Sequence, residues 1–395
     1  MQISYGKSVH GKKEISAVLK VLKKSTQMGN EVELFEKRIA KIFNKKYGVM
    51  VNSGSSALYL IFKILNLKKG SEVITPALTF GTTVSAIVNN DLKPVLIDIK
   101  KNTFNIDVDK IERNITNKTK VICIPHLIGN IADLKKIRKL SKKYNIFFIE
   151  DSADTLGSNY AGKPTGYYSD ASITSFYGSH VINGAGNGGM LCINNAKIFK
   201  KAILLRSWGR SSSIFGRNSE KIENRFNVKL QSIDYDKKFI FDELGFNFEP
   251  SEISAAFANI QLDNLKKNSE IRKKNFKFHQ KFFSKLKNYF EVPSVADEVD
   301  TNWLAYPFTV KKNNKFSRKQ LQIYLEKANI QTRVVFTGNI ARQPCMKNVD
   351  YRVDKSGLKN SDNVMRNGVM IGLHHGLKKQ HLKYIHNKIL QLIQN

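Results

Sequence analysis

Apolar runs of strand length alternate with amphipathic segments through the first half of the chain. Five runs rich in Val, Ile and Phe are predicted to be buried strands, at 47–51, 72–75, 94–97, 121–124 and 146–149. Segments with apolar residues at helical spacing are predicted between them, at 55–65, 81–88 and 131–144. This alternation predicts an α/β fold in which helices cover both faces of a mainly parallel sheet.

The pattern changes near residue 250. From there, apolar positions at helical spacing predict one long helix that runs toward Asn288. Mixed strand and helix patterns follow it. A chain of 395 residues is also too long for one compact core. We therefore predict a large domain over residues 1–250 and a smaller C-terminal α/β domain over residues 251–395.

A polar stretch between Gly209 and Glu243 interrupts this organisation. It is rich in Ser, Asn, Lys and Arg and has no clear strand or helix period. Loops of this length inside compact domains are usually functional. We interpret the stretch as a long excursion placed to cover a site.

The formal net charge of +32 raises the question of a polyanionic partner. Lysine pairs are spread from end to end rather than gathered, which is typical of solvated helix faces. We therefore expect neither a nucleic-acid nor a membrane partner. The apolar runs are far shorter than the roughly 18 residues of a membrane span, and the N-terminus shows no secretory signal. These features predict a cytoplasmic protein.

The three cysteines, Cys123, Cys192 and Cys345, are scattered and lack CxxC spacing. This pattern predicts neither a disulfide framework nor a metal site.

Candidate chemistry is found where predicted strands end. Residues 52–56, Asn-Ser-Gly-Ser-Ser, lie between a strand and a helix, where free backbone amides suit a phosphate. Phe80 follows the next strand and could stack on a flat heterocycle. Asp151 ends another strand and could pair with a protonated ring nitrogen, and Ser175 offers a further hydroxyl. Taken alone, each of the features at 52–56, Phe80 and Asp151 is more often a helix cap or a core position than a ligand contact.

The order and spacing of these features together resemble the DegT/DnrJ/EryC1/StrS family of sugar-modifying enzymes. The resemblance covers nearly the whole chain and rests on these segments: Gly29-Asn30, Phe35-Glu36, 53–58, Glu150-Asp151, 175–180, Gly188-Gly189, 245–247, Ala255-Ala256 and Gln261-Leu262. It implies the aspartate aminotransferase type I fold, bound pyridoxal 5′-phosphate (PLP) or its amine form (PMP), and a homodimer.

The resemblance also implies a role for each cofactor contact. Gly54, Ser55, Ser56 and Ser175 would hold the phosphate, and Asn247 would reach the phosphate of the partner subunit's cofactor. Phe80 would then stack on the ring, Asp151 would pair with its nitrogen, and Asp154 would lie beside it.

His180 stands where most members of this family have a lysine that bonds to the cofactor. No lysine lies between Lys163 and Lys197 that could replace it. Imidazole cannot form that bond, but it can move protons near neutral pH. The branch with histidine here comprises 3-dehydratases of nucleotide-linked 4-keto-6-deoxyhexoses. By this resemblance His180 takes a proton from the cofactor, the sugar 3-hydroxyl leaves, and Arg333 and Asn339 contact the substrate.

Members of this branch differ in how the reaction is completed. One group uses an iron–sulfur cluster that needs four thiolates, whereas this chain has three scattered cysteines and none in the excursion. We therefore expect no cluster and expect L-glutamate to regenerate PMP. An aminotransferase reaction and a non-catalytic binding protein remain alternatives, and the nucleotide cannot be deduced from the sequence.

Overall fold

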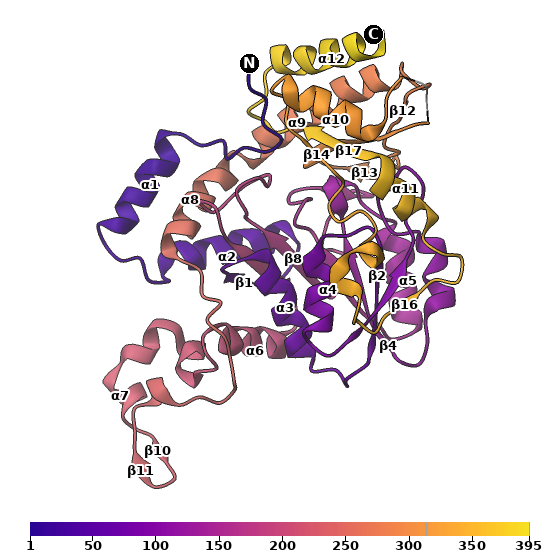
Figure 1. Ribbon diagram of the computed structural model, residues 1–395. Helices are drawn as coiled ribbons and strands as arrows, with labels where there is room; N and C mark the ends of the chain where they lie inside the picture. Colours follow the sequence, from indigo (N-terminus) through magenta and orange to yellow (C-terminus); the bar gives the residue numbers. More distant parts are fainter. Residues whose placement is uncertain (313–314, 395) are drawn as a thin grey trace.

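The computed structural model describes residues 1–312 and 315–394 (Figure 1). A sheet of eight strands forms the centre of the larger part. In spatial order its strands are β1 (Tyr47–Val51), β9 (Gly189–Ile193), β8 (Ala171–Ser175), β5 (Phe147–Asp151), β4 (Thr119–Pro125), β2 (Glu72–Pro76), β3 (Lys93–Ile97) and β16 (Arg352–Val353). β9 is antiparallel to β1 and β8, and the other neighbours are parallel. The predicted mainly parallel α/β sheet is confirmed.

Helices cover both faces of this sheet. α3 (Gly54–Leu65), α4 (Gly81–Val88) and α6 (Ala196–Arg206) pack on one face. The other face carries α2 (Asn30–Ile42), α5 (Leu134–Lys143) and α8 (Glu252–Asp263). α5 begins three residues later than predicted because the Asp133 side chain caps it, accepting a hydrogen bond from Lys136 N at 3.0 Å.

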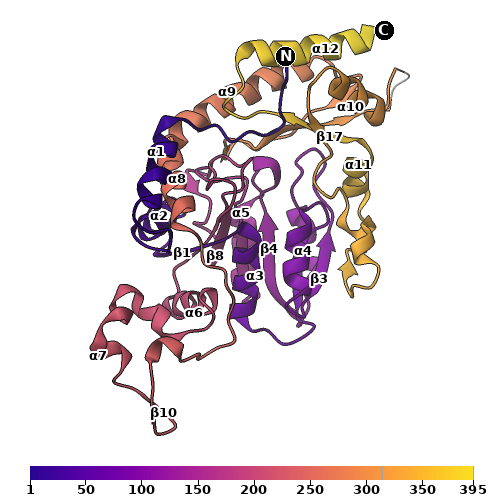
Figure 2. The same cartoon turned by 60° about the vertical axis from the view of Figure 1, so that its left-hand side comes forward.

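A second, antiparallel sheet lies at the carboxyl edge of the first (Figure 2). Its strands are, in order, β12 (Phe290–Glu291), β14 (Ala305–Val310), β17 (Gly368–Gly372) and β15 (Thr332–Arg333). The helices packed with it are α9 (Leu265–Phe283), α10 (Arg318–Lys327), α11 (Lys359–Asn367) and α12 (Lys379–Gln394). Their shared core includes Leu78, Leu127 and Ile128, which follow strands of the large sheet. The C-terminal domain therefore packs directly on the edge where those strands end.

The long helix predicted from residue 251 is two helices, α8 and α9. The break is at Asn264, whose backbone N–H donates to Gln261 O at 3.1 Å. α8 packs on the large sheet, whereas α9 belongs to the C-terminal core, so the interruption lets one segment serve both parts.

Two segments pass between the parts. Near the N-terminus, Ile3 pairs with Ile330 beside the C-terminal sheet. Residues 340–353 return to the large sheet, where β16 pairs with β3.

The excursion extends from the end of α6, away from both sheets (Figures 1 and 2). It contains the short elements η4 (Ser211–Glu220), α7 (Ile222–Arg225), β10 (Lys229–Leu230), β11 (Ile233–Asp234) and η5 (Lys237–Phe239). The remaining elements are α1 (Lys12–Leu22), β6 (Asn159–Tyr160), β7 (Lys163–Pro164), β13 (Val299–Asp300), η1 (Val108–Lys110), η2 (Glu112–Asn114), η3 (Leu127–Gly129), η6 (Ile340–Arg342) and η7 (Pro344–Met346).

None of the helices in the described part of the chain is both long and apolar enough to cross a lipid bilayer. The cytoplasmic location stays a prediction.

Candidate active site

A cavity of about 380 Å³ lies where β4, β5 and β8 end, beneath the C-terminal domain. Parallel strands bring their carboxyl ends to one edge of a sheet, which is where ligands bind in open α/β folds. The cavity wall combines the start of α3, the turn after β8 and two segments of the C-terminal domain. Of the predicted site residues, Gly54, Ser55, Phe80, Asp151, Asp154, Ser175 and His180 line it.

The turn between β1 and α3 presents a helix N-terminus to the cavity. The Ser53 hydroxyl caps α3 by accepting a hydrogen bond from Ser56 N at 3.0 Å. A Cβ on Gly54 would lie 2.7 Å from Ser175 Cβ, so glycine is needed for β8 to pack this closely. Ser55, Ser175 and the start of α3 thus line the same part of the molecule, a combination that suits a phosphate. The predicted Ser56 lies outside the cavity wall, and its hydroxyl donates to Asn52 Oδ1 at 2.6 Å.

Asp151 ends β5 and places a carboxylate in the cavity wall. One oxygen accepts a hydrogen bond from Ala153 N at 3.1 Å. Burial raises the pKa of Asp151 to about 6; Asp154 adds to this effect, and the Ala153 hydrogen bond and nearby His126 and His180 oppose it. A cationic ring nitrogen facing this carboxylate would relieve its desolvation.

His180 lies in the turn that follows β8, with its backbone N–H donating to Tyr177 O at 3.0 Å. Its side chain is 15% exposed, and Nδ1 lies 3.4 Å from Asp154 Oδ1. The other Asp154 oxygen accepts a hydrogen bond from Ile128 N at 2.8 Å, which fixes the carboxylate. Nδ1 makes no hydrogen bond within the described residues, so this contact is electrostatic. Asp154 faces one ring nitrogen and leaves Nε2 as the nitrogen that can exchange a proton in the cavity.

Phe80 caps the start of α4 and is 53% exposed, which is unusual for an aromatic side chain beside a core. It meets Phe336 of the C-terminal domain edge to face, with ring centroids 5.9 Å apart. Its remaining surface borders the cavity and is available to stack on a flat ring.

Asn247 and Asn339 also lie away from this chain's cavity. Asn247 is exposed beside the phosphate turn, where its carbonyl accepts a hydrogen bond from the Asn52 amide at 3.4 Å. Asn339 is fully buried; its amide donates to Asp362 at 2.8 Å, and its side-chain oxygen accepts from Ala341 N at 3.1 Å. In this structure Asn339 therefore stabilises a turn.

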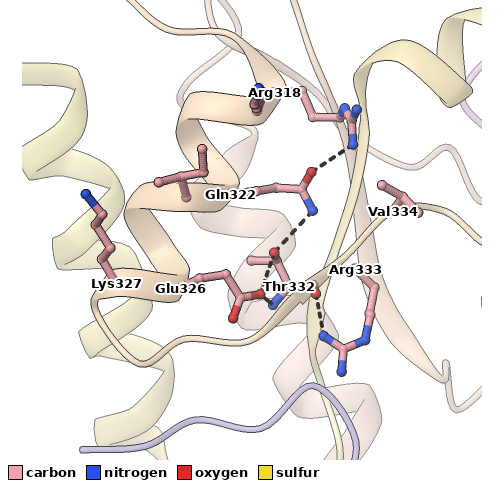
Figure 3. Close-up of a pocket in the computed structure, with 9 residues that line it drawn as sticks. Arg318, Gln322, Glu326, Lys327, Thr332, Arg333 and Val334 are labelled. Atoms are coloured by element: carbon pink, nitrogen blue, oxygen red, sulfur yellow. Dashed lines mark hydrogen bonds between the residues drawn. The ribbon is translucent and has the colours of Figure 1, made fainter.

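Arg333 lies in a separate, shallow groove of about 460 Å³ between α10 and β15 (Figure 3). Hydrogen bonds link Arg318, Gln322 and Thr332 across its floor, and Arg333 donates to Thr332 O at 2.7 Å. The Arg333 guanidinium also lies 5.5 Å from the ring centre of Tyr5, which lines the main cavity. One aromatic ring therefore separates this cation from the cavity.

Several cavity residues were not predicted from the sequence. His126 follows β4, and its Nε2 lies 3.0 Å from the buried Glu150 Oε2. His126 could have been proposed as a site residue, because it directly follows a predicted strand. Tyr5, Leu304 and Phe336 come from distant segments and carry no local signal.

The cysteines lie in three different places: Cys123 and Cys192 are buried in β4 and β9, and Cys345 is exposed on η7. Within residues 1–312 and 315–394, no three His, Cys, Asp or Glu side chains are grouped as a metal site would require.

These residues fit a phosphorylated pyridine cofactor. The helix N-terminus with Ser55 and Ser175 suits its phosphate, Phe80 offers a stacking face, and the raised pKa of Asp151 reflects a desolvated carboxylate that a cationic nitrogen would match.

The fold and this site are those expected of a protein that binds a phosphorylated pyridine cofactor, and comparison with known proteins gives the family. Residues 9–390 match the DegT/DnrJ/EryC1/StrS aminotransferase family, and the chain belongs to it. The chain is 34% identical over 366 residues to the lipopolysaccharide biosynthesis protein RfbH of Salmonella typhimurium, covering 90% of this chain and 83% of the relative. It is 32% identical over 308 residues to a dTDP-3-amino-3,6-dideoxy-alpha-D-galactopyranose transaminase of Aneurinibacillus thermoaerophilus, covering 78% and 76%.

A solved structure is also similar. The Escherichia coli GDP-4-keto-6-deoxy-D-mannose-3-dehydratase with bound hydrated PLP superimposes with a TM-score of 0.87 at 29% identity, covering 98% of this chain and 100% of that one. The fold is therefore that of the PLP-dependent sugar aminotransferases and their dehydratase relatives.

Proposed function

We propose that this protein is a PLP- and PMP-dependent 3-dehydratase of a nucleotide-linked 4-keto-6-deoxyhexose in deoxysugar biosynthesis. The observation that carries the proposal is His180, held 3.4 Å from Asp154 in the cavity wall, where the described lining residues include no lysine. The likeness to a solved 3-dehydratase over 98% of the chain supports it.

Each residue has a defined part in this proposal. The start of α3 with Ser55 and Ser175 binds the phosphate, and Phe80 packs on the ring. Asp151 keeps the ring nitrogen protonated, so that the bound cofactor can act as an electron sink. His180 takes up a proton at Nε2 and returns it, while Asp154 keeps the proton on Nδ1.

Similar proteins support the choice of substrates. A solved structure of a GDP-4-keto-6-deoxymannose-3-dehydratase contains GDP-perosamine, and another contains a trapped PLP-glutamate geminal diamine. We propose a nucleoside-diphosphate sugar and L-glutamate for this chain. We assign to Arg333 the attraction of the diphosphate; this assignment is supported by its guanidinium, which lies 5.5 Å from the ring centre of Tyr5 in the cavity wall. The excursion contains no cysteine, which supports a reaction without an iron–sulfur cluster.

The experiment that tests this function is product analysis by mass spectrometry. The protein is incubated with PLP, L-glutamate and 4-keto-6-deoxyhexoses linked to GDP, CDP, UDP or dTDP. We expect the product to lose the C3 oxygen while 2-oxoglutarate forms. An amino sugar would instead assign transamination, the reaction named for one relative. Cofactor binding without turnover across the panel would contradict both reactions and favour a binding protein.

We also propose that the protein is a homodimer. Residues 211–244, the excursion arm, expose ten large apolar side chains, of which Leu244 is 93% exposed. The ten are Ile214, Phe215, Ile222, Phe226, Leu230, Ile233, Tyr235, Phe239, Phe241 and Leu244. None of them joins a hydrophobic core of the described chain. Apolar surface of this extent usually marks an interface.

A double substitution in the excursion arm tests the dimer. We expect light scattering to show that Ile222→Asp with Phe226→Asp raises the dissociation constant at least about tenfold, because two charges would be desolvated. Ile323→Asp, at an exposed apolar residue of α10, is the matched control and should leave the dimer intact. Asn247→Ala should keep the dimer and weaken cofactor binding. A wild-type chain that stays monomeric at micromolar concentration would exclude the proposal.

A further inference from the structure

Arg272 on α9 is a fully buried cation, 0% exposed. Its Nη1 donates to Trp303 O at 3.0 Å and to Leu304 O at 3.1 Å. Its Nε and Nη2 find no hydrogen-bond partner within the described residues. Burial lowers the pKa of Arg272 to about 10, so the group stays charged at neutral pH. Burying a guanidinium with unpaired N–H groups lowers the stability of the fold, so such a residue is expected to have a function.

The peptide group that Arg272 holds continues toward the active site. Trp303 O accepts from Arg272, and the N–H of the same peptide, Leu304 N, donates to Ile128 O at 2.7 Å. The Ile128 N–H then donates to Asp154 Oδ2, whose partner oxygen faces His180 Nδ1. The last contact, 3.4 Å between Asp154 Oδ1 and His180 Nδ1, is electrostatic, since Nδ1 makes no hydrogen bond within the described residues. A series of contacts through residue 128 thus joins a buried cation of the C-terminal domain to His180.

Strained backbone conformations occur at the middle of this path. Ile128 and Trp303 both adopt left-handed conformations, with φ of 63° and 44°. Gly129 has φ of 106°, and a Cβ there would lie 2.6 Å from Trp303 Cα. Such conformations persist only where the surroundings hold them, and they are often associated with function.

The ionisable groups that act on the charge of Arg272 are Tyr5 and Asp154. Burial, with a smaller effect of the Arg272 charge, lowers the pKa of His374 to about 4 and that of His375 to about 3, so both stay neutral. Burial raises the pKa of the Tyr5 phenol, which keeps its proton. Tyr5, and after it the Asp154 carboxylate, oppose the fall in the pKa of Arg272 that burial causes.

We propose that Arg272 is a positioning residue for His180. It fixes the 303–304 peptide, this peptide fixes the turn at Ile128, and the turn aims Asp154 at His180 Nδ1. The proton is thereby held on Nδ1, and Nε2 is left to accept one. The proposal rests on the proposed function only in giving His180 a proton to move. Because Arg272 belongs to the C-terminal domain, the tautomer of His180 also depends on how that domain packs against the large sheet.

The tautomer of His180 tests this directly, by ¹⁵N NMR of cofactor-free protein with labelled histidine. We expect Arg272→Met to shift the ratio of Nδ1–H to Nε2–H forms about tenfold toward Nε2–H, because the Asp154 carboxylate would no longer be held close to Nδ1. Asp154→Asn serves as the reference for a broken pair. Arg272→Lys, which keeps the charge, should restore part of the ratio.

Asn275→Ala is the matched control, because Asn275 also lies on α9 and donates to the backbone carbonyls of Leu373 and His374. It should lower the melting temperature without changing the tautomer. If Arg272→Met did the same, Arg272 would be merely structural and the proposal would be overturned.

Gly129→Ala gives a second route if Arg272→Met does not fold. The added methyl displaces the Trp303 backbone while Arg272 remains, and the same shift toward Nε2–H is expected. An unchanged tautomer in folded Gly129→Ala protein would overturn the proposal. The tautomer experiment does not measure turnover. A tautomer shift would therefore support the role of Arg272 even if product analysis showed that the protein is not a dehydratase.

Discussion

Replacing His180 with asparagine is expected to lower the turnover number for dehydration by about 10²–10⁴, the usual contribution of a general acid–base group. Asparagine keeps the polarity of the side chain but cannot move a proton at neutral pH. Nucleotide-sugar affinity should change little, because the diphosphate is assigned to Arg333 and not to His180. Single-turnover kinetics and equilibrium binding would separate the two effects.

His10→Asn is the control for this prediction, since His10 is exposed and does not line the cavity. His180→Lys extends the test, because a lysine there could bond to the cofactor and produce a visible absorbance band while dehydration is lost. A His180→Asn protein that dehydrates as fast as the parent would show that the base is another group.

The large sheet was predictable because its parallel strands are continuous runs of β-branched and aromatic residues. β8 and β9 were not foreseen: β8 reads Ala-Ser-Ile-Thr-Ser, and most of its positions are polar. The strands of the C-terminal domain include two-residue elements such as β12 and β15, which leave no periodic signal. The break at Asn264 could not be predicted, because it depends on α8 and α9 packing in different hydrophobic cores, which local sequence does not specify.

The site was predictable to the extent that its residues follow strands. Asp151 and Ser175 end strands of one sheet and meet by topology alone. The proximity of Asp154 to His180 was not predicted; it is shown by the 3.4 Å distance between His180 Nδ1 and Asp154 Oδ1. Tyr5 and Arg272 reach the region through packing of the C-terminal domain, and no sequence pattern connects them to it.

Replacing Asp151 with asparagine is expected to stabilise the cofactor-free protein while it lowers turnover by about 10²–10³. The folded-state pKa of about 6 is above the ordinary value of 3.8. The folded protein therefore binds this proton more tightly than the unfolded chain does, and the resulting stability is full below pH 4 and lost as pH rises through 6. Above pH 6 the ionised carboxylate disfavours folding by about 1–3 kcal/mol, with cavity water screening part of it.

The asparagine side chain of the Asp151→Asn variant has the same shape as aspartate and can still accept the Ala153 hydrogen bond, but it never ionises. Thermal unfolding of the cofactor-free proteins should therefore show the variant more stable at pH 7.5 and nearly equal to the parent at pH 4. With cofactor added the order should reverse, because only the carboxylate can pair with a protonated ring nitrogen. A stability difference that does not change with pH would mean that Asp151 carries no burial penalty. A variant that binds cofactor as tightly as the parent would exclude Asp151 as the partner of the ring nitrogen.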